Sequence, residues 1–150
     1  MVQPILPPGF AVPPPLRDER FHLEPLTPAH NARDHAAWTT SIDHIRATPG
    51  FAGRAWPGIA ASLEENESSL RRHEEDAAAR RGFACAVLDA ASGEYLGCVY
   101  FYPPRSAEFD VDARSWVRAD WARLDALLHD IVRAWLGRCW PWRSPDYAVR

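Results

Sequence analysis

The stretch that decides the fold runs from Val111 to Arg118 and reads VDARSWVR. Small or apolar side chains alternate in it with charged or large ones, which is the two-residue period of a β-strand. We expect this strand to begin at Ala107. The residues that follow repeat apolar side chains at i, i+3, i+4 and i+7, which indicates a helix with one buried face. Its apolar positions are Leu124, Leu127, Leu128, Ile131, Val132, Trp135, Leu136 and Cys139. A strand followed by such a helix predicts an α/β domain.

Two more strands precede this one and form a hairpin. From Gly82 the apolar period is two, which puts Phe83, Cys85 and Val87 on one face. A turn at 90–93 separates them from a second strand over 95–102, which two prolines end. Further short strands are predicted at 20–26 and 146–149, so the sheet has about five strands.

Two helices lie between the first strand and the hairpin. Thr27-Pro28 supplies an N-cap and a first-turn proline, and we expect one helix from there to Thr48 with a buried stripe of Trp38, Ile42 and Ile45. Ser62 and Glu65 form a capping box that opens the second helix, which runs to about Arg81. This helix is mostly polar, so we expect it on the surface. Its thin apolar stripe consists of Leu63, Leu70 and Ala77.

Composition narrows the function classes. Every basic residue is arginine, so lysine chemistry such as Schiff-base formation is excluded. The formal charge is −3, and no basic run exceeds two residues, so we expect no nucleic-acid partner. No apolar stretch approaches the length of a membrane span, and no signal segment precedes the domain, so we expect no membrane partner and a cytoplasmic location. The three cysteines lack metal-ligand spacing and should be buried and reduced.

The first residues are rich in proline and favour an extended chain. We therefore divide the sequence into a proline-rich arm, 1–19, and a single domain, 20–150. The arm either lies on the domain or serves as a ligand for a partner, and the first reading is favoured.

The order strand, two helices, three-stranded meander, helix and strand resembles the GNAT superfamily of N-acyltransferases. Three phrases carry the likeness: LEPLTP at 23–28 resembles the family's first strand and turn, YLGCVY at 95–100 its third strand, and VDARSWVR at 111–118 its fourth. The resemblance implies an α/β fold of the α+β kind, with a mixed, mostly antiparallel central sheet and three main helices. The chain stops earlier than the family pattern, so we expect a C-terminally truncated GNAT-like domain.

The resemblance also implies acetyl-coenzyme A as a cofactor. Backbone groups near Trp116, Val117 and Arg118 would hold its pantetheine, and Trp121 and Arg123 would lie near its pyrophosphate. In the family a glycine-rich loop brings backbone N–H groups to the pyrophosphate at the helix N-terminus. Here the matching stretch, 118–126, contains no glycine and carries two aspartates. The cofactor is therefore acetyl-coenzyme A or none.

Asp112 stands at the position that resembles the family's general base, which would take the proton of an acceptor amine. The alternative is a solvated carboxylate on an exposed strand face. Glu108 and Asp110 alternate with Asp112, so these three acids could attract a cationic small-molecule amine. His44 ends the first helix, where the resemblance implies part of the acceptor site, or it is a helix C-terminal cation.

A metal site is not predicted. His30 and His35 are five residues apart and diverge on a helix. His30 and Asp34 share a face, which favours a surface hydrogen bond between them.

Two functions stay open. The first is a GNAT-like N-acyltransferase that moves an acetyl group from acetyl-coenzyme A to an amine of a small molecule or peptide. The second is a non-acetylating GNAT-like protein, either a binding or assembly module or one whose cleft serves another reaction. An exposed sheet edge at 147–149 also predicts a homodimer.

Overall fold

The computed structural model describes residues 3–58 and 61–150. Its five strands form one sheet in the order β1-β2-β3-β4-β5. Pairing is antiparallel from β1 to β4 and parallel between β4 and β5. The predicted mixed, mostly antiparallel sheet is therefore confirmed. The strands are β1 Phe21–Pro25, β2 Phe83–Asp89, β3 Tyr95–Tyr102, β4 Val111–Val117 and β5 Pro145–Tyr147.

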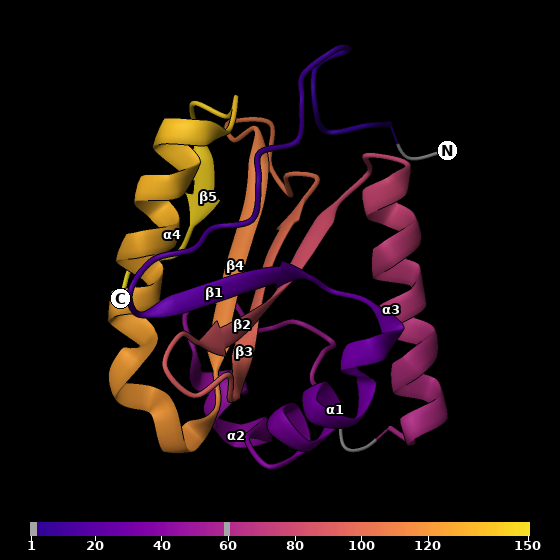
Figure 1. The fold of residues 1–150 in the computed structure, drawn as a ribbon. Helices are drawn as coiled ribbons and strands as arrows, with labels where there is room; N and C mark the ends of the chain where they lie inside the picture. The colour runs from indigo at the N-terminus through magenta and orange to yellow at the C-terminus, as the bar shows by residue number, and fades with distance from the viewer. Residues whose placement is uncertain (1–2, 59–60) are drawn as a thin grey trace.

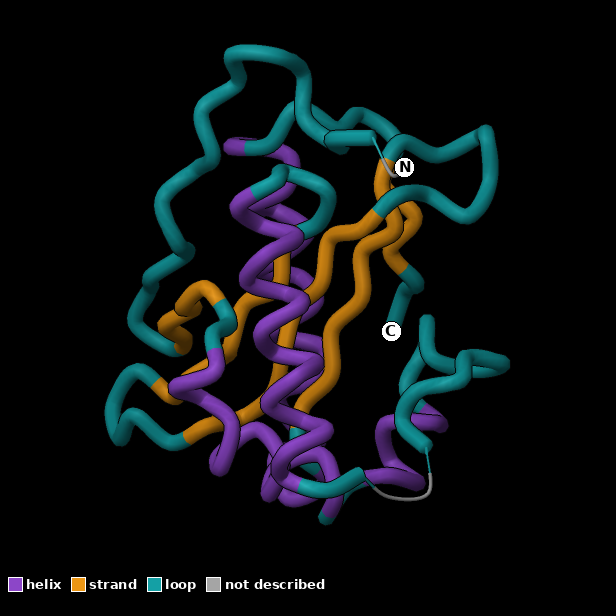
Figure 2. Tube along the Cα trace, turned by 90° about the vertical axis from the view of Figure 1, so that its right-hand side faces the viewer, coloured by secondary structure: helices purple, strands orange, loops and turns teal. Residues whose placement is uncertain are grey.

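Helices cover both faces of the sheet (Figure 1). The helix α4, Asp125–Cys139, lies on one face. The helices α1, Asn31–Thr39, and α3, Leu63–Ala78, lie on the other. In Figure 2 the side that carries α3 faces the viewer, and helix lies in front of the orange strands. Two 3₁₀ helices, η1 Pro28–His30 and η2 Ala119–Leu124, precede α1 and α4. The three main helices agree with the predicted fold class.

The core on the α4 face is built by Leu128, Val132 and Leu136 against β3 and β4. Trp140 stacks on Trp142 at 4.9 Å between ring centroids beside Phe101. The predicted buried stripe is too wide, because Leu127 and Cys139 are exposed. Both point away from the single sheet that α4 covers, so the expectation that all three thiols are buried is also wrong.

The predicted first helix is broken in two, α1 and the short α2, Ile42–Ala47. The hydroxyl groups of Thr39 and Thr40 donate to the carbonyl oxygens of His35 and Ala36. Such back-bonding competes with the helical ladder. The chain turns at this point and α2 starts anew. Trp38 and Ile45 are nevertheless buried as predicted.

The helix α3 begins with the predicted capping box, in which Ser62 and Glu65 bond each other's backbone N–H groups. Of its expected apolar stripe only Leu70 is fully buried, and Leu63 is half exposed. The helix is held to the sheet mainly through polar side chains, which are described below.

The strand β4 begins at Val111, four residues later than predicted. The carboxylate of Asp110 accepts hydrogen bonds from the backbone N–H groups of Arg143 and Ser144, and the Asp110 N–H donates to the Ser144 carbonyl oxygen. Residues 107–110 therefore form a turn rather than a strand. β4 is buried on both faces, apart from partial exposure at Arg114.

The N-terminal segment lies along the α4 side of the domain (Figure 1). Leu6 and Leu16 are buried in the core on that face. The Trp142 indole N–H donates to the Ile5 carbonyl oxygen at 3.0 Å, and Arg80 donates to the carbonyl oxygen of Phe10 at 2.7 Å. The division at residue 19 stays a prediction. Within residues 3–58 and 61–150, no helix is long and apolar enough to cross a membrane.

Candidate functional site

Asp112, the predicted base, is the centre of a buried ion cluster. Its two carboxylate oxygens each accept a hydrogen bond from Arg54 at 3.0 Å, and the Nε of Arg114 lies 3.5 Å from Oδ2. Only 3% of Asp112 is exposed. The expectation of a solvated carboxylate on an open strand face is therefore wrong. A bidentate guanidinium fixes both oxygens of a carboxylate in one geometry.

Asp110 and Glu108, the other two predicted acids, do not lie with Asp112 on one surface. Asp110 lies in the turn before β4 and is bonded to the backbone of Arg143 and Ser144. Glu108 is exposed in the same turn. The prediction that the three alternate on one strand face is wrong because β4 begins only at Val111.

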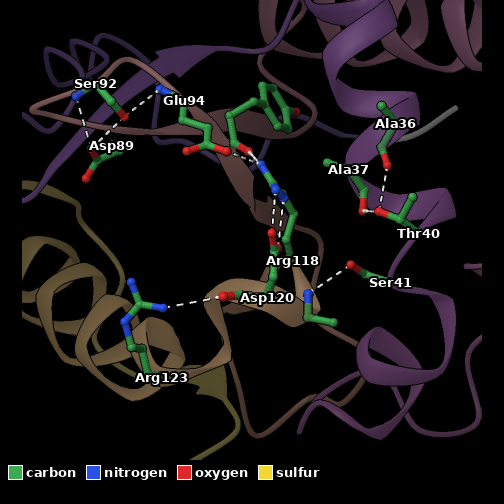
Figure 3. Close-up of polar contacts among 12 residues, drawn as sticks. Ala36, Ala37, Thr40, Ser41, Asp89, Ser92, Glu94, Arg118, Asp120 and Arg123 are labelled. Carbon is green, nitrogen blue, oxygen red and sulfur yellow. Dashed lines mark hydrogen bonds and ion pairs between the residues drawn. The ribbon is translucent and has the colours of Figure 1, made fainter.

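The β4–η2 turn, where a pyrophosphate would lie, is occupied by contacts within the chain (Figure 3). The guanidinium of Arg118 bonds Asp120 at 2.6 and 3.0 Å and Glu94 at 2.9 Å. The N–H of Ala119 donates to the Ser41 hydroxyl at 2.8 Å. The Arg118 side chain and the Ala119 N–H are therefore already engaged by groups of the chain itself.

The aromatic and basic side chains of η2 pair with each other. The Arg123 guanidinium carbon lies 4.8 Å from the centre of the Trp121 ring, and Arg123 also donates to the Asp120 carbonyl oxygen. Trp121 packs against the core on the α4 face. The placement of Trp121 and Arg123 near a bound pyrophosphate stays a prediction.

The edge of β4 beyond its pairing with β5 is also occupied. Parallel pairing ends at Ala113 and Tyr147. Past this point the guanidinium of Arg150 donates to the Ser115 carbonyl oxygen at 2.8 Å and forms an ion pair with Asp125 at 2.5 Å. Its side chain is 7% exposed. A pantetheine chain that paired with this edge would have to displace Arg150.

Trp116 and Val117, the other residues predicted to hold the cofactor, are fully buried on opposite faces of β4. The Trp116 indole N–H donates to the Tyr100 hydroxyl oxygen at 3.0 Å. Only the backbone of these residues could meet a ligand. Contacts within the chain engage the Arg118 side chain and the β4 edge at Ser115, and the assignment of Trp116 and Val117 to acetyl-coenzyme A stays a prediction.

His44 lies on α2, at the side of an open hollow of about 490 Å³ that also meets Ala119. Its Nε2 is buried and has no hydrogen-bond partner among residues 3–58 and 61–150. The two sequence interpretations of His44, acceptor contact and helix C-terminal cation, both stay predictions.

A second cavity, of about 270 Å³, lies between α3 and the sheet. We call it the α3 pocket. It was not predicted, because α3 was expected to be a surface helix. A signal was present, since Asn66, Ser69, Leu70 and His73 follow the i, i+3, i+4, i+7 period of a buried helix face. The lining residues are Leu26, Asp34, Trp56, Asn66, Ser69, Leu70, Arg72, His73, Tyr100 and Arg114.

The floor of the α3 pocket is a buried hydrogen-bond network centred on Asp34. Its carboxylate accepts hydrogen bonds from the Tyr95 hydroxyl at 2.6 Å and from the Asn66 amide at 3.0 Å. The Asn66 amide oxygen accepts from the Trp38 indole at 3.0 Å. The predicted His30–Asp34 bond is wrong, because His30 bonds Glu24 instead, at 2.9 Å. A fully satisfied buried network fixes the positions of its members.

The wall on α3 holds His73 in one tautomer. The Tyr102 hydroxyl donates a hydrogen bond to the Asp76 carboxylate at 2.9 Å. Its oxygen must therefore accept the hydrogen bond from His73 Nδ1, which lies 2.6 Å away. Burial lowers the pKa of His73, which keeps the ring neutral. The Nε2 atom is then a free acceptor, and it has no hydrogen-bond partner among the described residues.

The wall on β4 is Arg114. Its guanidinium carbon lies 5.3 Å from the ring centres of both Phe51 and Tyr100. Its Nε is buried with no hydrogen-bond partner in the described parts of the chain. Burial lowers the pKa of Arg114, and the charge of Arg54 lowers it further. Arginine nevertheless stays protonated at neutral pH because its ordinary pKa is far higher, so this side of the pocket is positively charged. No three potential metal ligands lie together within residues 3–58 and 61–150.

His73 makes stability depend on pH. Because burial depresses its folded-state pKa below 6.5, the unfolded chain takes up the proton first. The free energy of unfolding should fall as pH drops below about 6.5, by at most about 1.4 kcal/mol per pH unit from this one group. Urea titrations at several pH values measure this slope. The slope should flatten in a His73→Asn variant, and an unchanged slope would contradict the assignment. The charged or titratable groups around the ring are Asp76, Arg72, Tyr102, Tyr100, Arg114 and Asp34.

No protein-family model and no curated protein matches this sequence. Solved structures do match its fold. The ribosomal-protein-S5-alanine acetyltransferase from Vibrio fischeri matches 83% of this chain and 66% of its own, with TM-score 0.63 and 11% identity. A protein described as a GNAT-family acetyltransferase from Bordetella pertussis matches 83% and 71%, with TM-score 0.57 and 19% identity.

A third structure is the microcin C7 self-immunity acetyltransferase MccE in complex with acetyl-CoA and AMP. It matches 80% of this chain and 62% of its own, with TM-score 0.59 and 10% identity. The chain therefore spans about two thirds of the length of these structures. Identities this low carry the fold and not the activity. The resemblance found in the sequence is confirmed at that level, and the chain has a GNAT-like fold.

Proposed function

We propose that this chain is a GNAT-fold protein that binds a small ligand in the α3 pocket and does not use acetyl-coenzyme A. One observation carries the proposal: three groups of the β4 edge and the β4–η2 turn are already bonded to other groups of the chain. Ser115 O is bonded to Arg150, the Ala119 N–H to Ser41, and Arg118 to two carboxylates. The α3 pocket is lined by Arg114, whose buried Nε has no hydrogen-bond partner among the described residues.

The free energy needed to displace Arg150 also argues against binding of acetyl-coenzyme A. Binding of the cofactor at the β4 edge would separate Arg150 from Asp125, an ion pair whose side chains are 7% and 16% exposed. Breaking a buried pair costs about 3–5 kcal/mol, which corresponds to a loss of more than a hundredfold in affinity. Asp120 would in addition place negative charge at the position of the pyrophosphate.

Calorimetric titration with acetyl-coenzyme A tests the proposal. We expect no saturable heat at 1 mM cofactor and no shift of the thermal midpoint. A ligand present at 100 times its dissociation constant would stabilise the fold by about 2.7 kcal/mol, which is readily measured. Saturable binding with a dissociation constant below about 100 µM would overturn the proposal.

Acetyl transfer to a small-molecule or peptide amine is the second candidate. It is supported by the likeness to structures described as acetyltransferases, one of them in complex with acetyl-CoA. This candidate requires Arg150 to leave the β4 edge. It also needs a base other than Asp112, whose oxygens are held by Arg54. Release of free thiol from acetyl-coenzyme A in the presence of amines would favour it.

We further propose that the chain forms a homodimer and is located in the cytoplasm. β5 is the last strand in the sheet order, and an edge strand offers backbone groups that pair with another strand. Two copies joined at β5 would extend the sheet across the interface. Light scattering should then give twice the mass of the chain, whereas a mass of one chain at all concentrations would contradict the dimer.

A further inference from the structure

We propose that the α3 pocket binds a small aromatic carboxylate that carries a hydroxyl or amino group on its ring. This inference rests on the proposed function, because it names the ligand class of the same pocket. Arg114 and Arg72 would receive the carboxylate, and Nε2 of His73 would accept a hydrogen bond from the ring substituent.

The guanidinium groups around the pocket favour an anionic ligand. Two guanidinium groups, those of Arg54 and Arg114, share the single carboxylate of Asp112, and Arg54 takes both of its oxygens. Arg114 is thus left with a distant contact of 3.5 Å and a buried Nε without a partner. A buried N–H of a charged group that makes no hydrogen bond is costly, and a ligand carboxylate would give Arg114 the second carboxylate that it lacks.

The other charged lining residues do not cancel this cation. Asp34 is already committed to donors from Tyr95 and Asn66. Arg72 lies on the exposed side of the lining and adds a second positive charge. The two arginines therefore leave the pocket with net positive charge.

Size and shape favour a single ring. The cavity of about 270 Å³ is slightly smaller than typical ligand pockets, which begin near roughly 300 Å³, so it has room for only a small ligand. Three of its lining side chains are flat, those of Trp56, His73 and Tyr100. The rings of His73 and Tyr100 lie 5.6 Å apart with 31° between their planes. Flat side chains bind an aromatic ligand through stacked or edge contacts.

The tautomer of His73 adds a further condition. Nδ1 is protonated and donates a hydrogen bond to the Tyr102 hydroxyl oxygen. In the neutral ring Nε2 therefore carries no proton and can only accept a hydrogen bond. A ligand that meets this atom must bring an N–H or O–H group. A plain carboxylate satisfies the arginines and leaves His73 without a partner, so it should bind more weakly.

The test compares four compounds by calorimetry: 4-hydroxybenzoate, benzoate, 4-hydroxybenzamide and acetate. We expect 4-hydroxybenzoate to bind at least tenfold more tightly than 4-hydroxybenzamide, which has its shape without its charge. Benzoate should bind several-fold more weakly than 4-hydroxybenzoate, and acetate weakest of all. Equal affinity for the amide and the carboxylate would overturn the anionic class. Absence of binding by all four compounds would overturn the inference as a whole.

Two matched variants locate the site. Arg72→Gln should weaken 4-hydroxybenzoate about tenfold, whereas Arg71→Gln should leave it unchanged, because Arg71 pairs with Glu67 on the surface and does not line the pocket. His73→Gln should remove the preference for 4-hydroxybenzoate over benzoate. Equal effects of the two arginine variants would place the compound elsewhere. Binding of acetyl-coenzyme A would contradict the proposed function and leave these ratios untouched, so the two failures are distinguishable.

Discussion

A Gly97→Ala variant should lose at least about 3 kcal/mol of its free energy of unfolding, the upper end of the range for overpacked cores. A Cβ atom on residue 97 would lie 1.9 Å from the carbonyl oxygen of Trp116 and 2.9 Å from the Cα of Val117. Both atoms belong to the backbone of β4, which pairs with Gly97 in the ladder. Backbone in the centre of a sheet cannot move aside as a side-chain tip can, so the two strands must separate. Urea unfolding followed by tryptophan fluorescence measures the loss.

Gly137→Ala is the matched control. No atom lies within 4 Å of a Cβ built at that position, and Gly137 lies inside α4. Alanine is favoured over glycine in a helix by about 1 kcal/mol, so this variant should be slightly more stable than the parent chain. Equal midpoints for the two variants would show that the close approach of β3 and β4 is wrong.

An Asp112→Asn variant should be destabilised by about 3–5 kcal/mol, the cost of removing one member of a buried ion cluster. The substitution leaves the charges of Arg54 and Arg114 together without the carboxylate that separates them. The amide also cannot accept at both oxygen positions, so the bidentate contact with Arg54 is lost. Thermal and urea unfolding give the size of the effect.

The same variant separates a structural role of Asp112 from a catalytic one. A general base would be replaced at little cost in stability, and only a reaction rate would fall. Glu108→Gln serves as control, since Glu108 is exposed and its loss should change stability by less than about 0.5 kcal/mol. An Asp112→Asn chain as stable as the Glu108→Gln chain would contradict the buried cluster.

The order of elements could be predicted because it depends on local patterns. The repeat in α4, the alternation in β2 and β4 and the capping box of Ser62 and Glu65 are all readable from neighbouring residues. Errors arose where distant groups compete with the local pattern. The start of β4 is set by the backbone of Arg143 and Ser144, more than thirty positions from Asp110.

The site was less predictable for the same reason. Asp112 was placed on the correct strand, but its partner Arg54 comes from a loop 58 positions away. The α3 pocket depends on contacts from α1, α3, β3 and β4 together. The one sequence signal for it, the spacing of Asn66, Ser69 and His73, looks like an ordinary polar helix face until the helix is seated on the sheet.

The contact between Ile5 and Trp142 also bears on how the chain folds as it is made. The two residues are 137 positions apart, and a contact over such a distance is slow to form because the ordering entropy must be lost first. On the ribosome the proline-rich segment is made before the strands of the sheet, and Trp142 is added after all of β1 to β4. The core that covers Leu6 and Leu16 is therefore complete only after Trp142 has been added. An extended, proline-rich segment suits this interval, because it resists pairing with other strands until the surface that receives it exists.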